Sequence, residues 1–270
     1  EWWESPFYGI GLKMYDLLAG KYGFGRSRHL SRDQVVSEIP SINAEGLRGG
    51  TRYFDGQFDD ARLAISLAIT AAENGATLVN YAGVTAIEKD PQGVATGVTV
   101  REGETAESFS VSGKVTVNAT GPQADVVRQL DHPGAQPIVT PSQGIHIVLD
   151  RSFIPGDSAI MVPHTDDGRV MFAIPWHDVA VIGTTDTPIE EISTEPRPFD
   201  HEIEFILETA NRYLARPASR KDIRSVFAGI RPLVKSGSGG STAALSRDHT
   251  ILIDPDSGMM TVVGGKWTTY

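Results

Sequence analysis

The chain has 270 residues, and its 40% hydrophobic and 21% charged residues allow one large domain or two modest ones, each with a hydrophobic core. The formal net charge of −10 argues against a nucleic-acid-binding protein, which would concentrate basic residues. There is no cysteine, which excludes disulfides, thiolate zinc sites and cysteine nucleophiles and agrees with a reducing compartment. No apolar run approaches the ~20 residues that span a membrane, although peripheral attachment needs only an exposed apolar patch or an amphipathic helix.

The first 46 residues predict helices and loops. Apolar residues recur at helical spacing over residues 7–18, which predicts a helix there. The segment from Ser31 to Gln34 has the form of a capping box, which marks the start of a short helix. Pro40 is expected to stop that helix.

Residues 47–121 predict one helix followed by short strands. Asp59 and Asp60 suit the positive N-terminal end of a helix, which runs to about residue 73 and stops at Gly75. Strands or extended segments are expected at 51–54, 77–81, 84–88, 94–101 and 114–118, with a turn at 90–93. This order predicts an α/β layer that carries an antiparallel insertion.

Residues 143–184 predict an antiparallel sheet, because four short strand-like runs are separated by turns. The runs are residues 145–149, 159–162, 170–174 and 179–183. An amphipathic helix is expected over residues 200–214. A flexible Gly/Ser linker at 236–241 and two strands, at 250–253 and 260–263 with a hairpin turn between them, complete the pattern.

Generic motifs do not assign a function. A dinucleotide-binding GxGxxG must follow a strand and open a helix, and neither the glycines at 9 and 11 nor those at 23 and 25 satisfy that context. The glycines at 237–240 are not followed by the Lys-Ser/Thr of a phosphate-binding loop, and His201-Glu202 does not continue into a zinc-binding HExxH. These motifs therefore predict no metal site and leave an α/β domain without an assigned activity.

Longer strings, taken in order, are more informative. They are residues 53–63 (YFDGQFDDARL), 118–122 (NATGP), 144–148 (GIHIV), 174–176 (IPW), 182–186 (IGTTD), 228–233 (AGIRPL), 245–249 (LSRDH) and 264–270 (GGKWTTY). Together they resemble FAD-dependent, quinone-linked glycerol-3-phosphate dehydrogenases, with the related oxidases close by. The resemblance covers about residues 46–270. The NATG string alone is shared by many FAD oxidoreductases, whereas the ordered series is specific.

The resemblance implies a fold and a division into domains. The expected fold is an α/β (α+β) flavoprotein of the D-amino-acid-oxidase type, with a partial FAD-binding layer and an antiparallel-sheet substrate domain. Residues 1–46 would form a helical N-terminal segment, 47–121 part of the FAD-binding domain, 122–244 the substrate domain, and 245–270 a return to the FAD-binding domain.

The resemblance also nominates catalytic residues for the oxidation of glycerol 3-phosphate. A small dianionic phosphate calls for cationic, preferably bidentate, donors, and Arg231, in an expected Gly-Ile-Arg-Pro-Leu turn, is the first choice. Lys266 follows two glycines and is the second choice. His146 lies mid-strand and points opposite to Ile145 and Ile147, so it is the candidate base for the hydroxyl proton.

Further residues are implied by their positions in the family pattern. Thr184 and Thr185 would join Arg231 and Lys266 in binding the substrate, and Arg52 and Tyr53 are additional candidates. The residues expected to contact FAD are Asn118, Ala119, Thr120, Gly121, Gly264, Gly265, Lys266, Thr268 and Thr269.

The chain departs from the family pattern at its ends. The family has a GxGxxG strand–helix opening and a C-terminal helical domain, so we expect this chain to be an internal part of a longer enzyme and to hold little or no FAD alone. The expected partners are glycerol 3-phosphate and, in the full-length enzyme, a quinone. The expected location is cytoplasmic, peripheral at the inner face of the membrane. The oligomeric state and the choice between quinone and O2 stay open.

Two alternatives remain at this level. One is another D-amino-acid-oxidase-type FAD oxidoreductase that acts on an amine, such as glycine or sarcosine, or on a 2-hydroxy acid. The other is a non-catalytic domain that binds a phosphorylated ligand or a partner.

Overall fold

A computed structural model of the chain describes residues 4–163, 165–166, 168–234, 249–265 and 267. The chain forms two compact units, each assembled from separate stretches of sequence. Unit 1 consists of Glu1–Asp59, Ile145–Thr185 and Arg197–Ala228, and unit 2 of Asp60–Gly144, Asp186–Pro196 and Gly229–Tyr270. These units are defined by contacts rather than by ligands, so the division into FAD-binding and substrate domains stays a prediction.

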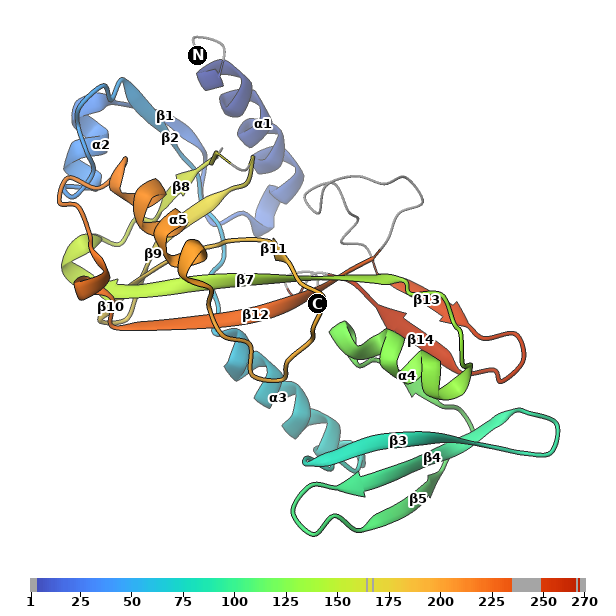
Figure 1. Cartoon of the computed structure of the whole chain (residues 1–270). Helices are drawn as coiled ribbons and strands as arrows, with labels where there is room; N and C mark the ends of the chain where they lie inside the picture. Colours follow the sequence, from blue (N-terminus) through green and yellow to red (C-terminus); the bar gives the residue numbers. More distant parts are fainter. Residues whose placement is uncertain (1–3, 164, 167, 235–248, 266, 268–270) are drawn as a thin grey trace. The chain divides into compact units, whose positions relative to one another are not determined.

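Unit 1 is built on an antiparallel sheet (Figure 1). Its strands are β7 (Val139–Asp150), β10 (Val179–Gly183), β9 (Met171–Trp176) and β8 (Ile160–Val162), in that spatial order, and β12 (Ser225–Val234) pairs with β7. The register places Gly183 opposite His146 and Val179 opposite Asp150. Both β7 and β12 include stretches that belong to unit 2, up to Gly144 in β7 and from Gly229 onward in β12.

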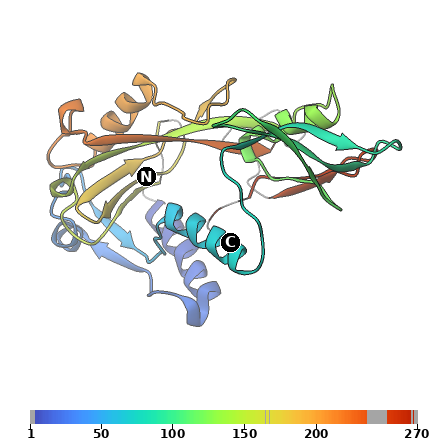
Figure 2. The same cartoon turned by 90° about the horizontal axis from the view of Figure 1, so that it is seen from below.

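The core of unit 1 lies between one face of this sheet and α5 (Asp200–Asn211). Alternate residues of β7, Ile145, Ile147 and Leu149, are completely buried, as the twofold repeat of a strand requires. The apolar face of α5 packs against them through Ile203, Ile206, Leu207 and Ala210. Figure 2 shows α5 on one side of the sheet and α1 (Glu4–Ala19) on the other.

The remaining elements of unit 1 are short. The hairpin-like pair β1 (Arg28–Ser31) and β2 (Gly49–Arg52) is antiparallel, and α2 (Arg32–Glu38) lies between them in sequence. Three single 3-10 turns, η1 (Gly20–Tyr22), η3 (Arg151–Phe153) and η4 (Arg220–Asp222), complete the unit.

Unit 2 contains two small sheets with α4 (Ala124–Asp131) packed against both (Figures 1 and 2). One sheet has the antiparallel order β3 (Ala82–Lys89), β4 (Ala95–Glu102), β5 (Ser108–Ser112). The other joins β13 (Thr250–Ile253) antiparallel to β14 (Met260–Val263), which pairs in parallel with β6 (Val117–Asn118). The unit also holds α3 (Asp60–Glu73), η2 (Gly121–Gln123) and β11 (Thr187–Pro188), which pairs with β7.

Most expected elements are present, with several corrections. The capping box of Ser31 and Gln34 is confirmed, since each side chain accepts a backbone N–H of the other residue. The strand expected over residues 77–81 was wrong, because that segment forms no strand. The turn expected around Arg231 was also wrong, because Gly229 and Pro232 are accommodated within β12. Strands β1 and β5 were not expected, and β6 is shorter than the run that predicted it.

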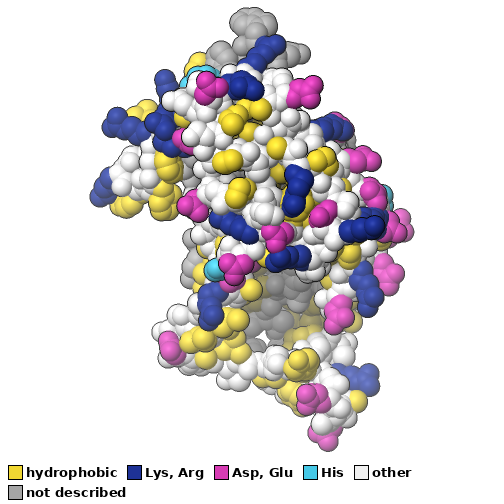
Figure 3. Space-filling view, turned by 90° about the vertical axis from the view of Figure 1, so that its left-hand side faces the viewer, with side chains coloured by type: hydrophobic (Ala, Val, Ile, Leu, Met, Phe, Trp, Pro, Cys, Tyr) yellow, Lys and Arg dark blue, Asp and Glu magenta, His cyan; other side chains and the backbone are white. Residues whose placement is uncertain are grey.

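Basic and acidic side chains are interspersed on the face shown in Figure 3. Several surface arginines of unit 1 are paired with carboxylates; Arg212, for example, bonds to Asp166 and holds the pKa of that carboxyl below its ordinary value. Among the residues described, no helix has both the length and the apolar character needed to cross a membrane. The same residues contain no cluster of three or more His, Asp or Glu arranged to hold a metal ion.

Candidate active site

Arg231 lies on β12 with its guanidinium directly against the backbone of Gly144 in β7. A Cβ added at Gly144 would come within 2.6 Å of Arg231 Cζ, which is far closer than an ordinary contact. A glycine inside a strand often marks a place where another group approaches the backbone closely. Gly144 therefore creates the space in which the guanidinium lies.

Asp186 and Ser142, which belong to unit 2 together with Arg231, hold this guanidinium. Arg231 Nη1 lies 3.2 Å from Asp186 Oδ1, and the Asp186 side chain is completely buried. Ser142 donates its hydroxyl to the same carboxylate oxygen, which fixes the carboxylate in turn. The arginine side chain remains 26% exposed, so it can be reached by a ligand while its orientation is set by buried groups.

His146 lies on β7, on the face opposite Ile145 and Ile147, as its place in the strand predicted. Its ring stacks on Phe227 of β12, with centroids 5.0 Å apart and an interplanar angle of 9°. On the neighbouring strand it faces Gly183, where an added Cβ would lie 2.7 Å from His146 Cγ. A glycine and an aromatic ring thus define where the imidazole can lie.

Thr184 and Thr185 follow the end of β10, and the structure gives them different surroundings. Thr185 is 4% exposed, and its hydroxyl accepts from the Ile145 backbone N–H and donates to Glu202, both at 3.0 Å. Thr184 is partly exposed and donates its hydroxyl to the Thr185 carbonyl at 3.2 Å. Direct contact of either residue with a substrate stays a prediction.

Arg52 and Tyr53 were weaker candidates for the same site. Arg52 forms an ion pair with Glu38 at 2.9 Å. Tyr53 donates its hydroxyl to the Met161 sulfur at 3.1 Å, and its pKa is raised, mainly by burial and further by the charge of Asp55. Both residues therefore have contacts within unit 1, and their contact with a substrate stays a prediction.

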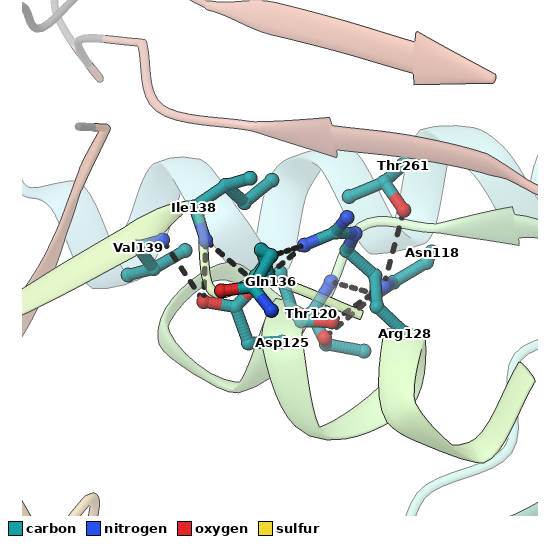
Figure 4. A network of polar contacts seen from close by, with 9 residues as sticks. Asn118, Thr120, Asp125, Arg128, Gln136, Ile138, Val139 and Thr261 are labelled. Atoms are coloured by element: carbon teal, nitrogen blue, oxygen red, sulfur yellow. Dashed lines mark hydrogen bonds and ion pairs between the residues drawn. The ribbon is translucent and has the colours of Figure 1, made fainter. Parts of the chain in front are cut away.

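The Asn118–Gly121 segment joins β6 to η2 and α4 in unit 2 (Figure 4). The buried Asn118 side chain donates to the Ala124 carbonyl at 2.9 Å and to Thr261 Oγ1 at 3.4 Å, and its oxygen accepts the Thr120 hydroxyl at 2.8 Å. Asn118 thus ties the end of β6 to β14 and to the first turn of α4. Ala119 and Thr120 are exposed, so a cofactor would meet this turn chiefly through them and through the main chain.

The first turn of α4, which follows this segment, is held by a second set of bonds, also drawn in Figure 4. The Asp125 carboxylate accepts the Ile138 and Val139 backbone N–H groups at 2.9–3.1 Å and pairs with Arg128 at 2.9 Å. Arg128 also donates to the Gln136 carbonyl at 2.7 Å. These contacts fasten the first turn of α4 to the segment that enters β7.

Glycines occupy three positions at which the protein backbone was expected to contact FAD. Gly121 has φ of +59°, and no atom lies within 4 Å of the position its Cβ would take. Gly264 and Gly265 have φ of +84° and +89°, a left-handed conformation that favours glycine. These segments fit a main chain that approaches a ligand closely. Lys266, Thr268 and Thr269 lie outside the described residues.

Five contributors were not singled out from the sequence: Ser142, Gly144, Gly183, Phe227 and Glu202. A glycine inside a strand and next to a polar residue can indicate that another group approaches the backbone closely. Gly144 and Gly183 both occur in such a context. Phe227 and Glu202 carry no comparable signal, because their contacts depend on pairing across the sheet.

Residues 10–270 match the family model of FAD dependent oxidoreductases, DAO. The chain belongs to this family. A probable mitochondrial glycerol-3-phosphate dehydrogenase of Caenorhabditis elegans is 38% identical over 271 residues, which is 99% of this chain and 37% of that protein. The chain therefore spans well under half the length of this curated relative.

Solved structures agree with the family. The glycerol-3-phosphate dehydrogenase of Bacillus halodurans complexed with FAD is 31% identical, with a TM-score of 0.77 over 89% of this chain and 46% of that one. Glycine oxidase of Bacillus cereus is 20% identical, with a TM-score of 0.68 over 98% of this chain and 64% of that one, and shows the fold alone. The expected D-amino-acid-oxidase-type fold is thereby confirmed.

Proposed function

We propose that the protein containing this chain oxidises sn-glycerol 3-phosphate to dihydroxyacetone phosphate with FAD. The observation that carries the proposal is the partly exposed guanidinium of Arg231, seated on Gly144 and held by the buried Asp186. A fixed guanidinium suits bidentate binding of a phosphate. The similarity to relatives named glycerol-3-phosphate dehydrogenase supports this assignment.

Each residue has a defined task in this proposal. Arg231 binds the phosphate oxygens of the substrate. His146 takes the proton of the C2 hydroxyl as C2 is oxidised. Lys266 would add a second positive charge near the phosphate. Thr184 would contact the substrate through its hydroxyl.

The chain also offers residues that fit FAD. The exposed Ala119–Thr120 turn, Gly121 at a helix start, and the left-handed Gly264 and Gly265 are the groups that would hold it. Bound FAD would supply the hydride acceptor of the reaction. Asn118 and Asp125 keep the first of these segments in place through their internal bonds.

Delivery of electrons to a quinone and peripheral attachment at the inner face of the membrane belong to the same proposal. Both rest on the family resemblance. Membrane fractionation of the full-length protein with a quinone-reduction assay tests them. Reduction of O2 but not of quinone would instead indicate an oxidase.

The substitution Arg231→Ala tests the proposal. Loss of two charge-assisted hydrogen bonds, at about 1.5–3 kcal/mol each, should lower kcat/KM for glycerol 3-phosphate by roughly 10²- to 10⁴-fold. The loss for glycerol, which has no phosphate, should be much smaller. Steady-state flavin reduction with both substrates measures this. Arg220→Ala is the matched control, because Arg220 is exposed and pairs with surface carboxylates.

Two results would contradict the proposal. Equal losses for glycerol 3-phosphate and glycerol would remove the phosphate-binding role from Arg231. Faster flavin reduction by glycine, sarcosine or a 2-hydroxy acid than by glycerol 3-phosphate would favour the other oxidoreductases that share this fold.

A further inference from the structure

The Thr185 hydroxyl takes the place of a main-chain partner at the point where β10 has ended. The β7–β10 ladder stops at the pair His146 and Gly183. One residue earlier in β7, the Ile145 N–H donates to Thr185 Oγ1 at 3.0 Å. The backbone just before His146 is therefore held by a side chain that lies beyond the end of β10.

Glu202 fixes the orientation of this hydroxyl. Thr185 donates to Glu202 Oε1 at 3.0 Å, and Glu202 Oε2 accepts the Phe199 N–H at 2.9 Å. Glu202 is 1% exposed. A threonine hydroxyl has one donor and rotates freely, so the carboxylate directs its proton and turns its lone pair toward Ile145. Two hydrogen bonds in series therefore run from the Ile145 amide through the Thr185 hydroxyl to the Glu202 carboxylate.

This series of hydrogen bonds begins at Ile145, the residue before His146. The His146 ring has close neighbours on two strands. The ring is confined by Gly183 on one strand and by the stacked Phe227 on another. If the Ile145 amide lost this partner, the backbone that carries His146 could shift, and the imidazole would move with it.

We infer that Thr185 and Glu202 are positioning residues, which hold the β7 backbone so that His146 reaches the substrate hydroxyl. The inference rests on the proposed function and replaces direct substrate binding as the role of Thr185. If Glu202 served only to cap α5, its contact with the Phe199 N–H would be enough. Capping would not require the Thr185 hydroxyl or its bond to Ile145.

The test compares Thr185→Val with Thr185→Ser in the full-length, FAD-loaded protein. Valine has nearly the same volume without the hydroxyl, whereas serine keeps the hydroxyl. Thr185→Val should lower kcat for glycerol 3-phosphate by about 10- to 100-fold, a fraction of what a general base contributes, with KM within about threefold. Thr185→Ser should keep kcat within about threefold of the unaltered enzyme.

Hydrogen exchange supplies a readout that does not depend on activity. The peptide that contains Ile145 should exchange its amide faster in Thr185→Val than in Thr185→Ser. Glu202→Gln is the second variant, because its amide cannot accept from both Thr185 and the Phe199 N–H. It should show the same fall in kcat and the same faster exchange, and this also covers a failure of Thr185→Val to fold.

The outcomes separate this inference from the proposed function. If the unaltered enzyme oxidises glycerol 3-phosphate and Thr185→Val does so equally fast, the positioning role is refuted and the function stands. Equal losses in the serine and valine variants would also refute it, because the hydroxyl would then be irrelevant. If the unaltered enzyme does not oxidise glycerol 3-phosphate, the proposed function is refuted together with the role that rests on it.

Discussion

Gly144→Ala should displace Arg231 without removing it. The new methyl carbon would lie 2.6 Å from Arg231 Cζ, whereas ordinary contacts begin at 3.4 Å. The guanidinium must therefore move by close to an ångström. Because the obstructing atoms are at the far end of a flexible side chain, the fold can accommodate the change. The φ angle of Gly144 is not in the left-handed region, so alanine introduces no backbone strain at this position.

The expected effect on catalysis follows from that displacement. A misplacement of about 1 Å at a substrate-positioning group can cost on the order of 10²-fold in rate. We therefore expect kcat/KM for glycerol 3-phosphate to fall by about 10- to 100-fold, with a smaller change for glycerol. The midpoint of thermal unfolding should change little. Flavin reduction with both substrates, together with calorimetry, measures these quantities.

Gly229→Ala is the matched control. Gly229 lies on β12 two residues before Arg231, and no atom comes within 4 Å of its added Cβ. Its kcat/KM should remain close to that of the unaltered enzyme. The reasoning fails if Gly144→Ala leaves kcat/KM for glycerol 3-phosphate within twofold, or if Gly229→Ala causes the same loss.

Two further predictions concern stability. Asp131 is buried and bonds to Lys89 at 2.9 Å and Ser257 at 2.5 Å, so Asp131→Ala should cost about 3 kcal/mol of unfolding free energy. Denaturant titration measures this, and a cost below about 1 kcal/mol would contradict it. Asp254 accepts the Ser257 backbone N–H, which holds its pKa below the ordinary value, so its stabilisation is present above about pH 4 and disappears as pH falls through the lowered pKa. Asp254→Asn should therefore lose less thermal stability than the unaltered protein on going to pH 3, and equal losses would argue against this.

Local patterns in the sequence were sufficient where neighbouring residues set the structure. The capping box at Ser31 needs only residue 34, and both bonds are present. The hairpin turn at residues 254–258 needs only its own side chains, since Asp254 accepts the N–H groups of Asp256 and Ser257. The direction of His146 followed from the twofold repeat of a strand in which it stands between Ile145 and Ile147.

Local patterns failed where a distant strand decided the outcome. Gly229 and Pro232 favour a turn when read alone, yet β12 continues through both because it pairs with β7. Residues 77–81 contain good strand formers, yet form no strand. Strand propensity depends strongly on tertiary context, which explains both errors.

The sequence by itself determined the family and the alternating faces of β7. It also identified Arg231 and His146, the two groups on which the proposed chemistry depends. Only the tertiary structure decided how those groups are held. Arg231 is 45 residues from Asp186, and Thr185 is 40 residues from Ile145, so their contacts exist only once strands separated in sequence have paired. Side-chain identity is a local property, whereas the position of a side chain depends on neighbours that the chain supplies from elsewhere.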